Sequence, residues 1–127
     1  SPPDDSYISG LAFYNSENLL LSTDLAVFRL SLADGNVVKL FDIRDAGHSD
    51  GWLRNIAYYQ GYALVAAFNG VVAINLSNNQ YQYLPYLGDA PASADQLHAK
   101  VLSIKHHRLW IGTVDGLYSI NLDDVQA

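Results

Sequence analysis

Two loops hold most of the side chains that could bind or react. The first spans residues 42–52 and carries a guanidinium, an imidazole, an indole and several carboxylates. The second spans residues 88–100 and adds carboxylates, an amide and another imidazole. Loops on a rigid scaffold carry function more often than core positions do. We therefore expect a small molecule or a peptide to contact these loops, through Arg44, His48, Asp50, Trp52, Asp95 and His98.

The sequence shows no recognisable catalytic pattern. No serine stands in a Gly-x-Ser-x-Gly elbow, and no glycine-rich phosphate loop is present. The absence of cysteine excludes thiol catalysis, disulfides and cysteine-based zinc sites. His106 and His107 are neighbours in a tight turn, and neighbours in an extended chain point to opposite faces, so they cannot easily bind one metal ion. We predict no catalytic residue, no metal and no cofactor.

Composition narrows the class of protein. The chain has 127 residues, of which 50% are hydrophobic and only 16% are charged, as expected for one folded domain over residues 1–127. With a net charge of −6, the chain lacks the positive field that would attract nucleic acids or anionic membranes. We therefore expect neither of them as a partner. No run of apolar residues is long enough to span a bilayer. The chain has no methionine and begins Ser1-Pro2-Pro3, so we expect a processed product or a piece of a longer protein.

The chain repeats itself three times. A similar five-residue apolar segment occurs three times, at residues 19–23, 63–67 and 109–113. Each segment is followed by a turn and a second apolar run. The last residues of these segments are Thr23, Ala67 and Thr113. The first two are 44 residues apart and the last two are 46 residues apart. The repeats span approximately residues 8–52, 53–100 and 101–127. A repeat of this length is typical of a propeller blade.

Each repeat is expected to form short antiparallel strands. The first strands are predicted at residues 8–14, 53–59 and 101–105, and the fourth at residues 37–42 and 80–86. Asn69-Gly70 and Asp115-Gly116 separate apolar runs, which indicates hairpin turns with positive φ at both central residues. Residues 63–68 and 109–111 are continuous apolar runs, typical of strands that are covered on both faces. No segment has helical periodicity.

These observations predict an all-β fold of about three four-stranded antiparallel repeats. The favoured architecture is a partial β-propeller, and the alternative is a β-trefoil, which also has three four-stranded repeats. The third repeat ends after residue 122 without a fourth strand. Propellers close with four to eight blades, so three blades leave open faces and an unpaired edge. We expect the chain to self-associate through those blade faces or through the missing strand.

The third repeat resembles a known family, the two-component regulator propeller repeat. The resemblance covers residues 96–123 and is weaker in the two earlier repeats, where Trp and Gly-Thr are replaced. The turn at residues 105–108 also departs from the acidic, glycine-containing turn of the family. The residues that carry the resemblance are Val101, Ile104, Leu109, Trp110, Ile111, Gly112, Thr113 and Gly116. Trp110 is expected to pack between blades, and the alternative is stacking on a ligand.

The resemblance implies a sensor domain that is not itself an enzyme. In that family a periplasmic or extracellular propeller precedes a membrane anchor and a histidine kinase or diguanylate cyclase. We therefore expect a ligand- or partner-binding propeller fragment of a bacterial signalling protein. One alternative is an interaction scaffold without a small ligand. A propeller hydrolase or lyase is a further alternative, and the scarcity of histidine and acidic clusters counts against it.

Overall fold

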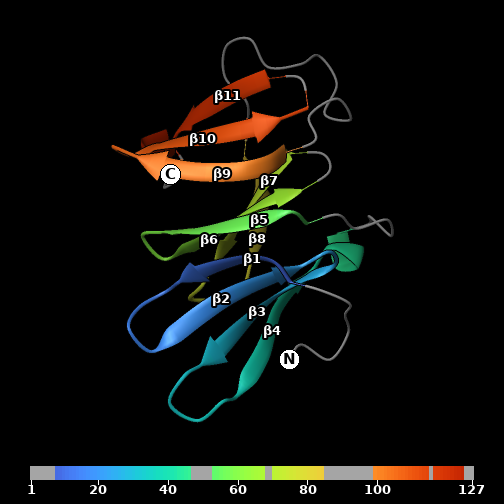
Figure 1. Cartoon of the computed structure of the whole chain (residues 1–127), viewed down its shortest axis with the longest axis vertical. Coiled ribbons are helices and arrows are strands. Elements are labelled where there is room, and N and C mark those ends of the chain that lie inside the picture. Colours follow the sequence, from blue (N-terminus) through green and yellow to red (C-terminus); the bar gives the residue numbers. More distant parts are fainter. Residues whose placement is uncertain (1–7, 47–52, 68–69, 85–98, 115, 125–127) are drawn as a thin grey trace.

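Three antiparallel sheets follow one another along the long axis of the molecule (Figure 1). The computed structural model describes residues 8–46, 53–67, 70–84, 99–114 and 116–124. Helical structure in these residues is limited to two short 3-10 segments, η1 (Ile43–Ala46) and η3 (Leu122–Asp124). The prediction of an all-β chain with almost no helix is confirmed.

Each sheet is one repeat, and consecutive strands pair in chain order. Blade 1 contains β1 (Ile8–Phe13), β2 (Asn18–Thr23), β3 (Ala26–Ser31) and β4 (Val37–Asp42). Blade 2 contains β5 (Asn55–Tyr59), β6 (Tyr62–Ala67), β7 (Gly70–Asn75) and β8 (Tyr81–Tyr83). Blade 3 contains β9 (Ala99–Lys105), β10 (Arg108–Thr113) and β11 (Gly116–Asn121). Pairing within each repeat is the propeller arrangement and excludes the β-trefoil.

The first strands of the blades lie next to one another. β1 contacts β5, and β5 contacts β9, as the blue, green and orange strands show (Figure 1). The approach of β1 to β5 is close because residue 10 is glycine. A Cβ atom there would lie 2.9 Å from the backbone nitrogen of Ile56 and 3.0 Å from Cα of Asn55. Gly10 therefore sets the spacing between blades 1 and 2.

Adjacent blades pack against each other through two apolar cores. The core between blades 1 and 2 includes Leu20 and Val27 on one side, with Val65 and Ile74 on the other. The core between blades 2 and 3 joins the opposite face of blade 2 to blade 3, through Leu64, Ala66, Val71, Ala73, Leu109, Ile111 and Ile120. Both faces of β6 are buried, as its continuous apolar sequence predicts.

The three repeats are in register. Thr23, Ala67 and Thr113 each end the second strand of their blade, as predicted. The predicted turn centres are wrong by one residue, because Gly70 pairs with Ala67 and Gly116 pairs with Thr113. The glycines therefore begin the next strand, with φ of 139° and 126°, which only glycine adopts readily. The positive φ expected at Gly116 is confirmed.

β10 is not covered on both faces, which corrects the sequence interpretation. Leu109 and Ile111 are buried against blade 2, while Trp110 points to the opposite face and is 40% exposed. The indole of Trp110 therefore does not pack between two blades of this chain. The apolar run was misleading because hydrophobicity marks a face made for burial and does not show that a neighbour is present.

Candidate functional site

Most of the predicted ligand-contacting residues lie outside the described part of the chain. These are His48, Asp50, Trp52, Asp95 and His98. Arg44 is described, and it lies in η1 immediately after β4. The structure therefore shows how the first loop is anchored and leaves the role of the five other residues as a prediction.

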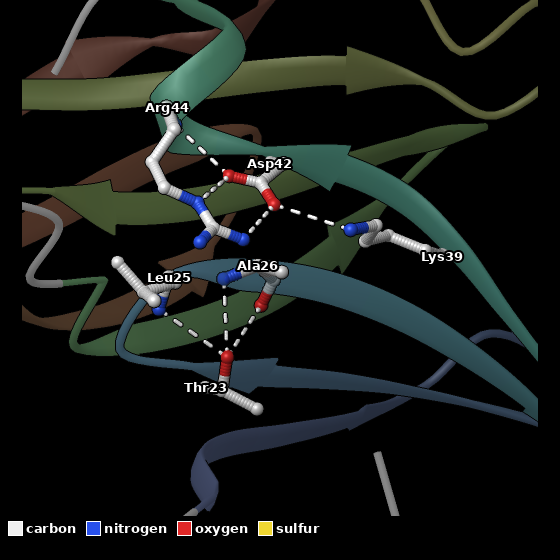
Figure 2. Close-up of polar contacts among 6 residues, drawn as sticks. All are labelled: Thr23, Leu25, Ala26, Lys39, Asp42 and Arg44. Atoms are coloured by element: carbon white, nitrogen blue, oxygen red, sulfur yellow. Dashed lines mark hydrogen bonds and ion pairs between the residues drawn. The ribbon is translucent and has the colours of Figure 1, made fainter. Parts of the chain in front are cut away.

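Arg44 is held by a buried carboxylate at the end of β4 (Figure 2). Its Nε and Nη2 donate to Asp42 at 2.8 and 2.6 Å, and its backbone N–H donates to Oδ1 at 3.0 Å. Lys39 Nζ donates to the second carboxylate oxygen at 3.2 Å. The side chain of Asp42 is only 6% exposed, so both cations act on a partly desolvated charge.

The electrostatics of this cluster fix its protonation state. Hydrogen bonds from Arg44 lower the pKa of Asp42 far below its ordinary value of 3.8, and the Lys39 hydrogen bond lowers it further, against an opposing contribution from burial. Asp42 is therefore ionised at all physiological pH values. It anchors the start of the loop and cannot act as a general acid or base near neutrality.

The turn between β2 and β3 fixes both ends of the same loop. Ile43 donates its N–H to the carbonyl of Leu25 at 2.9 Å, and Leu53 donates to the carbonyl of Asp24 at 2.9 Å. The turn is itself held by Thr23, whose Oγ1 accepts from the N–H of Ala26 at 3.0 Å (Figure 2). Oδ1 of Asp24 is buried there and has no hydrogen-bond partner in the described residues. The described residues on either side of the first loop, Ile43 and Leu53, are thus bound to the same turn.

Two polar pockets lie at the opposite end of the blades, and sequence reasoning missed them. The larger, of about 420 Å³, is on blade 1, and the smaller, of about 160 Å³, is on blade 2. The first is lined by Tyr14, Asn15, Asn18, Arg29, Ser31, Asp34, Asn36 and Val38. The second is lined by Tyr62, Ala73, Asn75, Asn78, Gln80, Tyr81 and Gln82. Six lining residues of the blade 1 pocket have a counterpart 44 residues later that lines the blade 2 pocket. An alignment of the first two repeats could therefore have indicated that the two pockets are equivalent.

The blade 1 pocket is built around an ordered turn. Asp34 accepts the N–H of Asn36 at 3.0 Å, and this bond together with the Ser31 hydroxyl lowers the pKa of Asp34. On its other side Asn15 accepts from the N–H of Glu17 at 2.8 Å. A guanidinium, amides and a carboxylate therefore meet beside an aromatic ring, which suits a polar ligand and shows no paired acid and base.

A third polar contact joins blades 2 and 3. Tyr59 Oη lies 2.6 Å from Nδ1 of His107, and the same nitrogen lies 3.8 Å from Asp123. His106 and His107 form the two-residue turn between β9 and β10, with φ of 52° and 63°. Burial, with a smaller effect of Asp123, raises the pKa of Tyr59, so this phenol stays protonated at neutral pH. His107 thus acts as an inter-blade contact.

Within the described residues, no group of three or more His, Asp or Glu side chains could hold a metal ion. No helix in the described part of the chain is long and apolar enough to cross a membrane.

Solved structures with the same fold include extracellular domains of one-component and two-component systems and computationally designed proteins. The extracellular domain of BT4673 from B. thetaiotaomicron, named a one component system, matches 99% of this chain at TM-score 0.73 and 18% identity. The extracellular domain of the hybrid two component system BT3049 from the same organism matches 92% at TM-score 0.69 and 13% identity. The computationally designed protein Ika8 matches 92% at TM-score 0.64 and 15% identity.

These similarities concern the fold. The chain spans 17% of the matched BT4673 chain, 16% of the BT3049 chain and 34% of Ika8. No protein-family model matches the chain, and no curated protein matches it. The propeller architecture is thus established from the structure, and the resemblance to the two-component regulator propeller repeat rests on the residues of the third blade.

Proposed function

We propose that this chain is part of the periplasmic or extracellular propeller of a membrane-anchored bacterial sensor. The observation that carries the proposal is the stack of blades, which shares its fold with the extracellular domains of BT4673 and BT3049. The motif at residues 109–113, which resembles the two-component regulator propeller repeat, supports the same reading. Fold alone is a weak basis for function, so the site has to support it independently.

The described polar groups suit binding better than catalysis. The carboxylates of Asp42 and Asp34 have pKa values below their ordinary range, and the phenol of Tyr59 has a raised pKa. A general acid or base works best with a pKa near the operating pH, and all three shifts move away from it. The proposed role is therefore recognition of a small molecule or peptide without chemical change.

The proposed contact surface is the end of the blades where the inter-blade loops emerge. The first loop is tied to the turn between β2 and β3 at both of its ends, and Arg44 is held at its base. A tethered loop loses less conformational entropy on binding than a free one. In this proposal His48, Asp50, Trp52, Asp95 and His98 contact the ligand from the two loops.

A thermal-stability screen against sugars, peptides and amino acids tests the proposal. A ligand at a hundredfold excess over its Kd stabilises the folded state by about 2.7 kcal/mol. For any hit, Trp52→Ala and His98→Ala should abolish the shift, while Arg29→Ala and Asn18→Ala at the opposite end should preserve it. The reverse pattern would move the binding site to the blade 1 pocket and overturn the loop assignment.

An interaction scaffold without a small ligand is the second candidate. The observation that favours it is the exposed apolar surface at both ends of the stack, including Leu11 at 60% and Leu117 at 66% exposure. Exposed apolar patches of this kind mark protein contacts. A screen with no hit across these ligand classes would favour the scaffold over the sensor.

A further inference from the structure

The blade 1 pocket lies on the face of that blade that is turned toward blade 2. Arg29 in β3 pairs with Leu20 in β2 and with Val38 in β4, and paired residues of a sheet point to the same face. Leu20 belongs to the core between blades 1 and 2. Tyr14 also lines the pocket, and its ring lies 5.2 Å from that of Tyr58 in β5. The pocket therefore belongs to an inner face of the stack and does not arise because the sequence stops.

Arg29 is the cationic group of this pocket. The residue is partly buried, and its guanidinium makes no ion pair with any other residue that the structure describes. The amide groups of Asn15, Asn18 and Asn36 line the same pocket and add further N–H donors. A guanidinium donates from a planar fork that matches the oxygens of a phosphate or a carboxylate. The pocket is therefore suited to an anionic group of a ligand.

The blade 2 pocket has the same frame without these charges. Ala73 and Asn78 occupy in blade 2 the positions that Arg29 and Asp34 occupy 44 residues earlier in blade 1. Asn78 accepts the N–H of Gln80 at 2.9 Å, and Asp34 accepts the equivalent N–H of its own turn at 3.0 Å. An amide oxygen is therefore sufficient to hold this turn. The negative charge of Asp34 is not required by the turn and is available to a ligand.

The carboxylate of Asp34 determines which anions the pocket accepts. Hydrogen bonds from the Asn36 N–H and the Ser31 hydroxyl hold the pKa of Asp34 below its ordinary value, so this group is an acceptor and repels a fully deprotonated anion. An anion that keeps a proton can donate it to this carboxylate, which replaces repulsion with a hydrogen bond. A phosphate ester keeps one proton below its second pKa of about 6, whereas a sulfate ester or an ionised carboxylate has none to donate.

We propose that the blade 1 pocket binds the monoanion of a small phosphate ester. Arg29 donates to the phosphate oxygens, Asn15 and Asn36 add amide donors, and the P–OH group donates to Asp34. The organic part of the ester lies against the ring of Tyr14. The net charge of −6 agrees with a small, singly charged ligand rather than a polyanion. This ligand goes beyond the proposed function, whose site is at the loop end, so either proposal can fail without the other.

Titration of the ¹⁵N-labelled chain with phenyl phosphate and with phenyl sulfate, followed by nuclear magnetic resonance, tests this proposal. At about pH 5.5 both probes are mainly monoanions of similar shape, and only the phosphate carries a proton. We expect phenyl phosphate to bind about tenfold more tightly than phenyl sulfate, because it gains one charge-assisted hydrogen bond. The side-chain amide signals of Asn15 and Asn36 should shift as phenyl phosphate is added, which locates the probe in the pocket.

Two substitutions separate the roles of the two charges. Arg29→Gln should weaken the binding of both probes by about tenfold or more, since both use the guanidinium. Asp34→Asn should bring the affinities of the two probes close together, and it should keep the turn because Asn78 holds the equivalent turn in blade 2. Lys105→Gln is the control for the loss of one positive charge, because Lys105 is exposed in β9 of blade 3. It should change neither affinity.

Three results would overturn the proposal. Equal affinities of the parent chain for the two probes would show that Asp34 accepts no proton from the ligand. Phosphate binding that survives Arg29→Gln would place the ligand elsewhere on the chain. The absence of binding of either probe at millimolar concentration would show that the pocket is not an anion site. The dispersion of the backbone amide signals shows whether each variant is folded, so that loss of binding is distinguished from loss of folding.

Discussion

Leu64 and Trp110 hold the same position in successive blades, yet Leu64 is fully buried and Trp110 is 40% exposed. Each is the third residue of the second strand of its blade. The difference therefore comes from the neighbour that each face has, and not from the strand itself. It is also the clearest sign that blade 3 has a surface made for another blade.

Glycine at position 10 is expected to be more critical than glycine at position 112. A Cβ at residue 10 would meet the backbone of β5, which cannot move without separating blades 1 and 2. At Gly112 it would meet Cγ2 of Val101 at 2.5 Å, a side chain that is 55% exposed and can rotate away. Gly10→Ala should lower the free energy of unfolding by about 1–3 kcal/mol. Gly112→Ala should cost clearly less in the same urea titration, and equal losses would contradict this account.

The hydroxyl of Thr23 is expected to matter more than that of Thr113. Thr23 is 0% exposed, and its Oγ1 accepts from two backbone N–H groups and donates to the Ala26 carbonyl. Thr23→Val should lower the free energy of unfolding by about 1–3 kcal/mol, because buried N–H groups lose their acceptor. Thr113 donates to the Gly116 carbonyl at 2.9 Å in an exposed turn, where water can replace it. Thr113→Val should have a smaller effect in thermal unfolding, and the opposite order would contradict the prediction.

Asp42 should stabilise the fold in a pH-dependent manner. Its pKa is lower in the folded chain than the ordinary value of 3.8, so its contribution is complete above that value and is lost as the pH falls below it. Asp42→Asn should cost about 1–3 kcal/mol at pH 7. The difference between the two proteins should shrink as the pH falls below 3.8 in urea titrations. Asp45→Asn, at the exposed carboxylate of η1, is the control and should show little effect at pH 7. A constant difference down to pH 2 would contradict the assigned role.

Gly116→Val should strain the hairpin between β10 and β11. The φ of 126° at Gly116 is disfavoured for a β-branched residue, and a Cβ at this position would meet no atom within 4 Å. We expect a loss of about 1–2 kcal/mol from backbone strain alone. Leu117→Val in the same strand has ordinary strand geometry and is the control. Equal unfolding midpoints for Gly116→Val and the parent chain would show that the turn tolerates the change.

Salt should strengthen association of the chain. The net charge of −6 makes two copies repel each other, and screening shortens the range of that repulsion to about 8 Å at physiological ionic strength. The dissociation constant for self-association should fall between low salt and physiological salt, as measured by light scattering. An apolar contact is itself insensitive to this range, so a rise in the dissociation constant would indicate that ion pairs hold the copies together.

The sequence determined the blades because their information is local. Successive side chains of a strand point to opposite faces, and in β7 Val72 and Ile74 lie in one core while Ala73 lies in the other. The spacing of Thr23, Ala67 and Thr113 predicts which residues are equivalent in the three blades, because similar segments form strands with the same bounds. The predicted turn before the third strand of blade 3 is confirmed, although Gly116 begins that strand and is not a central residue of the turn.

Tertiary structure alone decided which faces are covered and which polar groups meet. The same kind of apolar residue is buried at Leu64 and exposed at Trp110, because burial depends on the next sheet and not on the strand. Residues far apart in sequence, such as Tyr59 and His107, come together only through the stacking of blades. Loop anchoring also depends on stacking order, since Leu53 reaches the carbonyl of Asp24 only when blade 2 follows blade 1 in space. Local pattern thus specifies a blade, and contacts between blades create the surfaces on which function depends.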